Sequence, residues 1–246
     1  MWRWNKRHNG VTNYRSLLRL IRLHNKESEP VCLVTFNYDT MLEKAIPALG
    51  GNIKEIKDYI SSPRYQIFKI HGSVNWGRVV AHIPFDLSAV SKEHVPMEII
   101  RNVQFVLRPN NILDDYEIMG EVTVHKITAP DSNTEYALFP AIAIPVESKD
   151  DFQLPSGHLT RLKEHIPRIT KLLVIGWRAT DAPFLKLIVG SAPPNILVHI
   201  VCEDQLKGDE VALHMQNAGV KGDYFTQYQG FTDFVVRGKA ESFLKL

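Results

Sequence analysis

The sequence predicts an α/β fold in which helices cover both faces of a parallel sheet, and three similar blocks carry that prediction. Each block opens with an apolar run and then passes through a turn that contains polar residues or glycine. The runs are Val31–Val34, Gln66–Ile70 and Leu172–Ile175. Short apolar runs rich in β-branched residues are typical of strands buried on both faces. Repeated units of strand, polar turn and helix predict a parallel sheet.

The first block, Val31–Ile46, shows the pattern most clearly. After the apolar run come the polar residues Thr35, Asn37 and Asp39, and apolar residues then recur at helical spacing. Ligands of open α/β sheets bind at the carboxyl ends of strands, so Asn37 and Asp39 are candidate site residues. A purely structural interpretation remains open, in which Asp39 caps the helix and Asn37 makes the turn.

The other two strands end in comparable turns. His71, Gly72 and Ser73 follow the second strand, and Gly176 follows the third. A glycine at such a position permits a positive φ or the close approach of a ligand to the backbone. Asp181 stands at the predicted start of the next helix. Two simpler interpretations stay open, with His71 as a turn histidine and Gly176 as a strand exit.

A helix is expected from Asn13, ahead of the first strand. One of its faces is apolar (Tyr14, Leu17, Leu18, Ile21) and another is basic (Arg15, Arg19, Arg22). We interpret the basic face as solvated surface, and phosphate binding is the alternative.

Several local elements are predicted outside the three blocks. Gly50 and Gly51 are expected to end the helix that follows Asp39, and Asn52–Ile56 is predicted to be a short strand. Ser156 is predicted to cap a helix.

Towards the end of the chain, Ile196–Cys202 is predicted to be a further strand. The next helix is expected to follow Gly208 and Asp209 and to stop at Gly219. Four aromatic residues are predicted to anchor the core: Tyr224, Phe225, Phe231 and Phe234.

The whole chain, residues 1–246, is predicted to form one domain, with residues 77–155 as an insertion or small subdomain that covers the site. Val103–Leu107 and Glu121–Ile127 are β-like runs within it. Tyr136–Val146 contains two prolines, so it is predicted to be extended loop rather than a central strand.

The same insertion contains three histidines, His82, His94 and His125. Their spacing matches no metal site that we recognise. An amidohydrolase-like or nuclease-like function of the insertion is one hypothesis for this part of the chain.

Composition limits the classes of partner. The net charge is +2 over 246 residues, which does not favour a nucleic acid or a membrane surface. Cys32 and Cys202 both lie in apolar runs and are expected to be buried, reduced thiols, which fits a cytoplasmic location. There is no Cys-x-x-Cys pair, so a four-thiolate zinc site is excluded.

Taken together, the turns TFNYDTMLE, IHGSVNW and VIGWRATDAPFL resemble the sirtuin-like domain family, in particular its bacterial branch of anti-phage defence proteins. The segment PAIAIPVESKDDF between the last two adds to the resemblance, which extends from Val31 to the end. It implies a Rossmann-like fold of the DHS-like NAD/FAD-binding type. It also implies that NAD is bound, or is hydrolysed at the nicotinamide–ribose bond.

The resemblance further implies roles for individual residues. Asn37 matches the family's catalytic asparagine, which holds the ribose and the attacking water, and His71 matches its general base. Asp39 matches the aspartate that orients the site. The remaining matches line the pocket (Thr35, Ser73), pack against the dinucleotide (Gly176, Trp177, Asp181) or lie beside its adenosine half (Glu203). Histidine suits this task because its pKa is near neutral.

The sequence departs from the family in two respects. Sirtuin deacylases carry a four-cysteine zinc module that this chain cannot form, so neither zinc nor protein deacylation is expected. The family's first strand and its Gly-Ala-Gly-x-Ser loop, which cradles the diphosphate, have no counterpart before Val31. The fold is therefore expected to be N-terminally truncated, with a protein partner or a second copy completing the sheet. This chain alone is expected to bind NAD weakly.

The resulting hypothesis is a cytoplasmic sirtuin-like domain derived from an NAD hydrolase (NADase) of antiviral defence. The alternative is a catalytically inert regulatory or interaction module, or a fragment of a larger defence protein.

Overall fold

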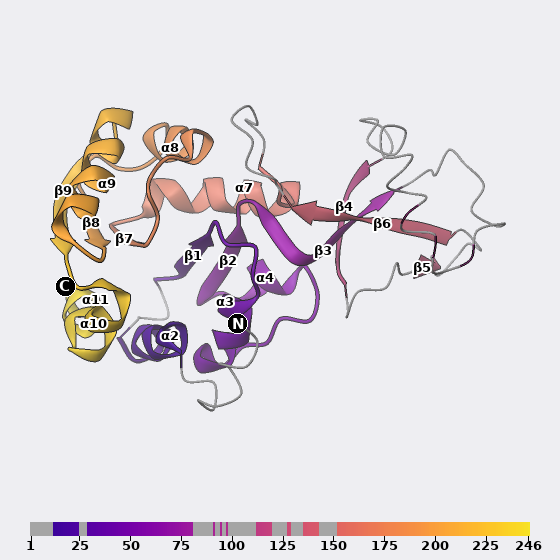
Figure 1. Cartoon of the computed structure of the whole chain (residues 1–246), viewed down its shortest axis with the longest axis horizontal. Helices are drawn as coiled ribbons and strands as arrows, with labels where there is room; N and C mark the ends of the chain where they lie inside the picture. Colours follow the sequence, from indigo (N-terminus) through magenta and orange to yellow (C-terminus); the bar gives the residue numbers. More distant parts are fainter. Residues whose placement is uncertain are drawn as a thin grey trace.

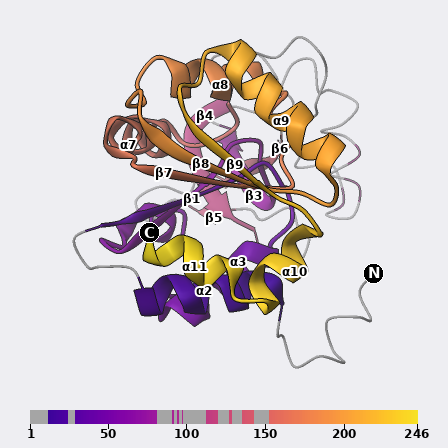
Figure 2. The same ribbon diagram turned by 90° about the vertical axis from the view of Figure 1, so that its left-hand side faces the viewer.

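The computed structural model describes residues 12–24, 29–80, 91, 94, 97, 112–119, 127–128, 135–142 and 152–246. Parallel strands lie between two layers of helices, and a smaller antiparallel sheet extends from one end (Figures 1 and 2). The predicted fold class, a Rossmann-like α/β arrangement with helices on both faces of parallel strands, is confirmed.

The parallel strands form two groups. β1 (Val31–Thr35) pairs with β2 (Tyr65–Lys69). β7 (Lys171–Ile175), β8 (Ile196–Val201) and β9 (Gly222–Gln227) form the second group in that order. Every residue of β2 is buried, as expected for an apolar run with helices on both sides.

Two layers of helices pack on these strands, on opposite sides in Figure 2. One layer contains α2 (Asn13–His24), α3 (Met41–Ala45), the 3₁₀ turn Ile46–Leu49, α10 (Gly230–Val236) and α11 (Lys239–Lys245). The other contains α7 (Ser156–His165), the 3₁₀ turn Ile166–Arg168, α8 (Ala182–Val189) and α9 (Gln205–Ala218). The short helix α4 (Asp58–Ser61) leads into β2. Each layer encloses its own cluster of buried apolar side chains.

The antiparallel sheet has the strand order β4-β3-β6-β5. Its strands are β3 (Gly72–Val80), β4 (Ile112–Ile118), β5 (Ile127–Thr128) and β6 (Glu135–Ile142). β3 begins three residues after β2 ends, so the chain passes directly from the parallel strands into this sheet through Ile70 and His71.

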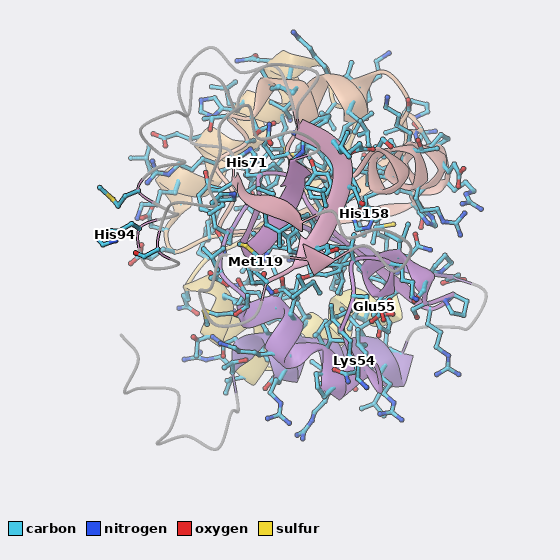
Figure 3. All side chains as sticks on the ribbon, turned by 90° about the vertical axis from the view of Figure 1, so that its right-hand side faces the viewer. Lys54, Glu55, His71, His94, Met119 and His158 are labelled. Atoms are coloured by element: carbon cyan, nitrogen blue, oxygen red, sulfur yellow. The ribbon has the colours of Figure 1, made fainter. Side chains whose placement is uncertain are left out.

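The helix predicted from Asn13 is confirmed, and its apolar residues Leu17, Leu18 and Ile21 are buried. Gly50 ends the 3₁₀ turn with φ 83°, as its position predicted. The predicted strand Asn52–Ile56 is wrong. The backbone N–H groups of Lys54 and Glu55, which Figure 3 labels, donate to Asp58 Oδ2 at 2.8 and 2.9 Å instead of to a strand.

The prediction that Tyr136–Val146 avoids a central strand position is wrong for its first residues, because β6 pairs with both β3 and β5. Among the described residues, β5 pairs with Glu135 and Tyr136, whereas Pro140 pairs with Gly77 of β3. The β-like runs Val103–Leu107 and, except for Ile127, Glu121–Ile127 lie outside the described residues.

α7 begins at Ser156, but the capping role predicted for this residue is wrong, and so is the predicted start of α9. Ser156 makes no capping hydrogen bond; its own N–H donates to the Asp114 carboxylate at 3.0 Å. α9 begins before Gly208 because Asp204 accepts a hydrogen bond from the Lys207 N–H at 2.9 Å and caps the helix. Gly208 faces the sheet, where a Cβ would lie 2.3 Å from a Thr226 methyl carbon, so a larger residue does not fit.

The terminal aromatic residues differ in burial. Phe234 is fully buried, whereas Phe225 is 54% exposed because alternate residues of β9 face solvent. Cys32 and Cys202 are free thiols, each partly buried. Burial raises the pKa of Cys32 to about 11, so this thiol stays protonated at neutral pH.

We predict that Gly72→Ala destabilises the fold by more than about 2 kcal/mol. Gly72 has φ 79°, and a Cβ there would lie 1.8 Å from the Ala141 carbonyl oxygen. Gly157→Ala is the matched control, because Gly157 lies exposed in α7 with open space around it. The control variant should raise the free energy of unfolding by roughly 0.5–1 kcal/mol. Urea unfolding of both variants measures the difference, and equal stabilities would contradict the prediction.

Candidate functional site

The carboxyl ends of β1, β2 and β7 open onto one cavity of about 1860 Å³. Their meeting at one edge agrees with the parallel arrangement that the sequence predicted. Six of the residues singled out from the sequence line this cavity: Thr35, Asn37, His71, Gly176, Trp177 and Asp181. The cavity exceeds the usual 300–1,000 Å³ of a ligand pocket because it continues between β1 and β7.

His71 and Asp181 form the closest polar pair of the site. His71 Nε2 lies 2.7 Å from Asp181 Oδ2, and the two side chains are 24% and 15% exposed. Asp181 is fixed by its second role as N-cap of α8, where Oδ1 accepts from the Phe184 N–H at 3.0 Å. One carboxylate therefore holds both a helix start and the histidine.

The ionisation of Asp181 favours a particular tautomer of His71. Burial alone would raise the Asp181 pKa, but the hydrogen bonds from His71 and from the Phe184 N–H lower that pKa below its ordinary value. The carboxylate is thus ionised at neutral pH and accepts a hydrogen bond from Nε2–H. Nδ1 of neutral His71 is then left with a lone pair, the form that a general base requires.

An aromatic cluster surrounds this pair. Phe36 and Trp177 stack face to face, with ring centroids 4.9 Å apart and planes 4° apart. Phe36 also contacts the edges of His71 and Phe184 at 5.4 and 5.2 Å between centroids. Sequence reasoning missed Phe36 and Phe184 as site residues. The available signal was that Phe36 and Trp177 each directly follow the end of a strand or its glycine.

The first turn is built around Thr35 and Asn37. Thr35 Oγ1 accepts from the Asn37 N–H at 3.1 Å, which bends the chain out of β1. Asn37 is exposed, and its side chain hydrogen-bonds to Tyr14 of α2. The pKa of Tyr14 is raised chiefly by burial and also by the nearby Asp39 charge, so its hydroxyl stays protonated.

Three predicted site residues do not line the cavity. Asp39 Oδ1 accepts from the Met41 N–H at 2.8 Å, a turn just ahead of α3, whose N-cap is Thr40. Ser73 is fully buried, and its hydroxyl donates to Asn75 Oδ1 at 2.6 Å. Glu203 is exposed beyond β8 and accepts from Lys207 Nζ at 2.7 Å.

A buried network of hydrogen-bonded polar groups fixes the Thr35–Asp39 turn from the protein interior. Lys69 is fully buried, and its Nζ donates to the Asp39 carbonyl and, at 2.8 Å, to Glu43 Oε1. Tyr59 donates to the same Glu43 oxygen at 3.0 Å, and Trp76 Nε1 donates to Tyr59 at 3.1 Å. Burial, and then the Glu43 charge, raise the pKa of Tyr59. Nothing in our sequence analysis indicated this network.

Among the described residues, no three His, Cys, Asp or Glu side chains converge as a metal site would require. His82 and His125 lie outside those residues. His94 contacts Ser91 and lies at the periphery, away from His71 (Figure 3). None of the helices in the described ranges has the length and apolar character needed to cross a membrane.

Comparison with known families gives one match. Residues 31–83 match the family model of the SIR2-like domain. This match supports a sirtuin-like domain. It covers the Thr35–Asp39 turn and the His71–Ser73 turn but not Asp181. Comparisons with curated proteins and with solved structures gave no match.

We predict that Lys69→Met destabilises the protein by about 3–5 kcal/mol, because it leaves the Glu43 carboxylate buried without its cation. The double variant Lys69→Met/Glu43→Gln removes the charge while a side-chain acceptor for Tyr59 remains. It should recover a substantial part of the loss. Urea unfolding of the wild type, the single variant and the double variant provides the test. A single-variant loss below about 1 kcal/mol would show that the pair is not buried in solution.

We also predict a pH-dependent effect of Asp181→Asn. Asparagine keeps the cap of α8 but loses the charge that His71 contacts. Because the folded-state pKa of Asp181 is lowered, its ionised form stabilises the fold above the ordinary carboxyl pKa, and this contribution disappears as the pH falls through the lower, folded-state pKa.

Wild type should therefore be more stable than Asp181→Asn at pH 6–7 by about 1 kcal/mol, with the difference shrinking as the pH falls below the ordinary carboxyl pKa of about 4. Urea unfolding across this range measures it. A difference that stays constant with pH would contradict the lowered pKa of Asp181.

Proposed function

We propose that this chain carries an NAD site at the carboxyl ends of β1, β2 and β7, derived from an NAD glycohydrolase of bacterial defence. The observation that supports this most is the His71–Asp181 pair, at 2.7 Å, in the same cavity as Asn37. The SIR2-like match over residues 31–83 gives independent support for an NAD-related function.

In the proposed reaction, water attacks C1′ of the nicotinamide ribose, the bond from C1′ to the pyridinium nitrogen breaks, and neutral nicotinamide leaves. The leaving group is already cationic, so the protein needs to position the substrate and accept a proton rather than supply a strong nucleophile. Nδ1 of His71 takes the proton from water, and Asp181 stabilises the resulting imidazolium. The Asn37 amide both donates to and accepts from ribose hydroxyls, after release from Tyr14.

The remaining site residues have supporting roles in this proposal. The Phe36–Trp177 stack excludes water from one side of His71 and offers a flat apolar surface to the nicotinamide ring. Asp39 orients the first turn through Met41. Thr35 and Ser73 shape that turn, Gly176 leaves room beside Trp177, and Glu203 lies on the adenosine side.

We predict that the wild-type chain releases nicotinamide from millimolar NAD and that His71→Ala lowers kcat by about 10²-fold or more. A base acts mainly in the transition state, so NAD affinity should change less than kcat. Asn37→Ala should weaken both. Chromatography of free nicotinamide measures turnover, and calorimetry measures affinity.

His94→Ala is the matched control, since it removes a histidine that does not line the cavity and that lies apart from His71 in Figure 3. It should retain wild-type turnover. Full activity of His71→Ala would exclude the proposed base, and loss of activity in His94→Ala would instead favour chemistry in residues 77–155.

The alternative is a catalytically inert sirtuin-like regulatory or interaction module. In the part of the chain that the structure describes, the parallel strands are interrupted between β1 and β7, and this favours the inert module because a site at such an interruption is held less rigidly. The weak NAD binding expected from the sequence agrees with either function. Absence of nicotinamide release at millimolar NAD would favour the inert module.

A further inference from the structure

The two groups of parallel strands face each other across a gap. Within the described residues, β1 pairs only with β2, and β7 pairs only with β8, so each leaves one edge unpaired. All five residues of β1 and all five of β7 line the same cavity. We call the part of the cavity between these two edges the strand slot.

The two edges run in the same direction. Phe36, directly after β1, stacks on Trp177, two residues after β7. His71, two residues after β2, contacts Asp181 on the β7 side. The carboxyl ends of both groups are therefore adjacent, and a strand between them would be parallel to both.

The two edges also lie in one plane, because their side chains alternate between the same two apolar clusters. One cluster, with α2, α10 and α11, receives Val31, Leu33, Leu173 and Ile175. The other, with α7 and α8, receives Cys32, Val34, Leu172 and Val174. Most of these residues are only partly buried, unlike those of β2. A further strand in this plane would be covered on both faces.

The backbone of β1 presents hydrogen-bonding groups to the slot. The Val31 N–H donates to the Arg64 carbonyl at 3.0 Å, and the Thr35 carbonyl accepts from the Ile70 N–H at 3.1 Å. Residues of a parallel strand point their backbone groups alternately to the two sides. Cys32 and Val34 therefore point theirs away from β2, into the slot.

The same argument applies to β7. The Thr170 carbonyl accepts from the Leu197 N–H at 2.9 Å, and the Gly176 N–H donates to the Val201 carbonyl at 3.3 Å. The backbone N–H and C=O groups of the even-numbered residues of β7 thus face β8. The backbone groups of Lys171, Leu173 and Ile175 face the slot.

We propose that the strand slot binds a segment of a separate partner polypeptide as one parallel strand of about five residues. The completed sheet would have the order β2-β1-partner-β7-β8-β9. One strand placed between the two edges would lie about 4.8 Å from each and could bond to both. Its side chains must be apolar on both faces, and it can contain no proline, since its N–H groups bond alternately to β1 and β7. This inference does not depend on the proposed NAD site.

Other occupants fit the slot less well. Each strand in the described part of the chain is paired in its own sheet, so a second copy that inserted one of them would have to withdraw it. Residues 1–11 contain three cations, Arg3, Lys6 and Arg7, and no apolar run of five.

The apolar run Val103–Leu107 contains Gln104, whereas a strand in the slot must be apolar on both faces.

Hydrogen exchange of the purified chain tests the proposal. The probe is a synthetic peptide with the strand Ile-Val-Val-Val-Ile preceded by two lysines for solubility. At saturating peptide, the amides of Cys32, Val34, Leu173 and Ile175 should exchange about tenfold more slowly, with β9 unchanged. A control peptide with proline in place of the central valine should give little protection.

A protein variant provides a second test. Val34→Pro removes an N–H that faces the slot and leaves the β1–β2 hydrogen bonds intact, so it should weaken binding of the peptide by about tenfold. Circular dichroism checks its fold, and the control peptide decides the question if the variant does not fold.

Three results would overturn the proposal. The first is no protection at saturating peptide. The second is slow exchange of these four amides in the chain alone, which would mean that its own segment fills the slot. The third is protection that rises with protein concentration without peptide, which would identify a second copy as the occupant.

Discussion

The hydrogen bond between His71 and Asp181 joins two halves of a parallel sheet that share no backbone ladder within the described residues. The stack of Phe36 on Trp177 makes a second connection at the same end. These contacts bring the turns after β1, β2 and β7 together. The candidate site is therefore also a structural junction, and a change at Asp181 affects helix α8, the histidine and the spacing of the two halves together.

Buried polar groups beneath this junction fix the conformation of one of its turns. Lys69 occupies a position in β2 where an apolar side chain would ordinarily be expected, and its charge is offset by Glu43. A buried ion pair contributes little net stability, but breaking it is costly, so such pairs fix one conformation. Here the fixed conformation is that of the Asp39 turn, whose carbonyl accepts from Lys69. The geometry of Asn37 thus depends on residues that never reach the cavity.

The sequence was sufficient to predict the strands β1, β2, β7 and β8 and the turns that carry the candidate site, but not β6 as a strand. Those predictions rest on local signals, namely apolar runs and glycine, and the elements that these signals predict are present in the tertiary structure. Predictions from local signals were wrong where another residue of the fold forms a hydrogen bond with the backbone of the segment. Asp58 captures the N–H groups of Lys54 and Glu55, and Asp114 takes the N–H of Ser156. The network around Lys69 was invisible for the same reason, since its partners are 26 to 30 positions away.

The unpaired edges of β1 and β7 have a consequence for how this protein behaves in concentrated solution. Free strand edges are templates for self-association, and natural proteins protect them with charge. Two cations, Arg168 and Lys171, line the cavity near the amino-terminal end of β7. Two copies that approached through this edge would bring these like charges together. Salt screens such repulsion over a Debye length of about 10 Å at 0.1 M. The colloidal stability of the protein should therefore decline as ionic strength rises.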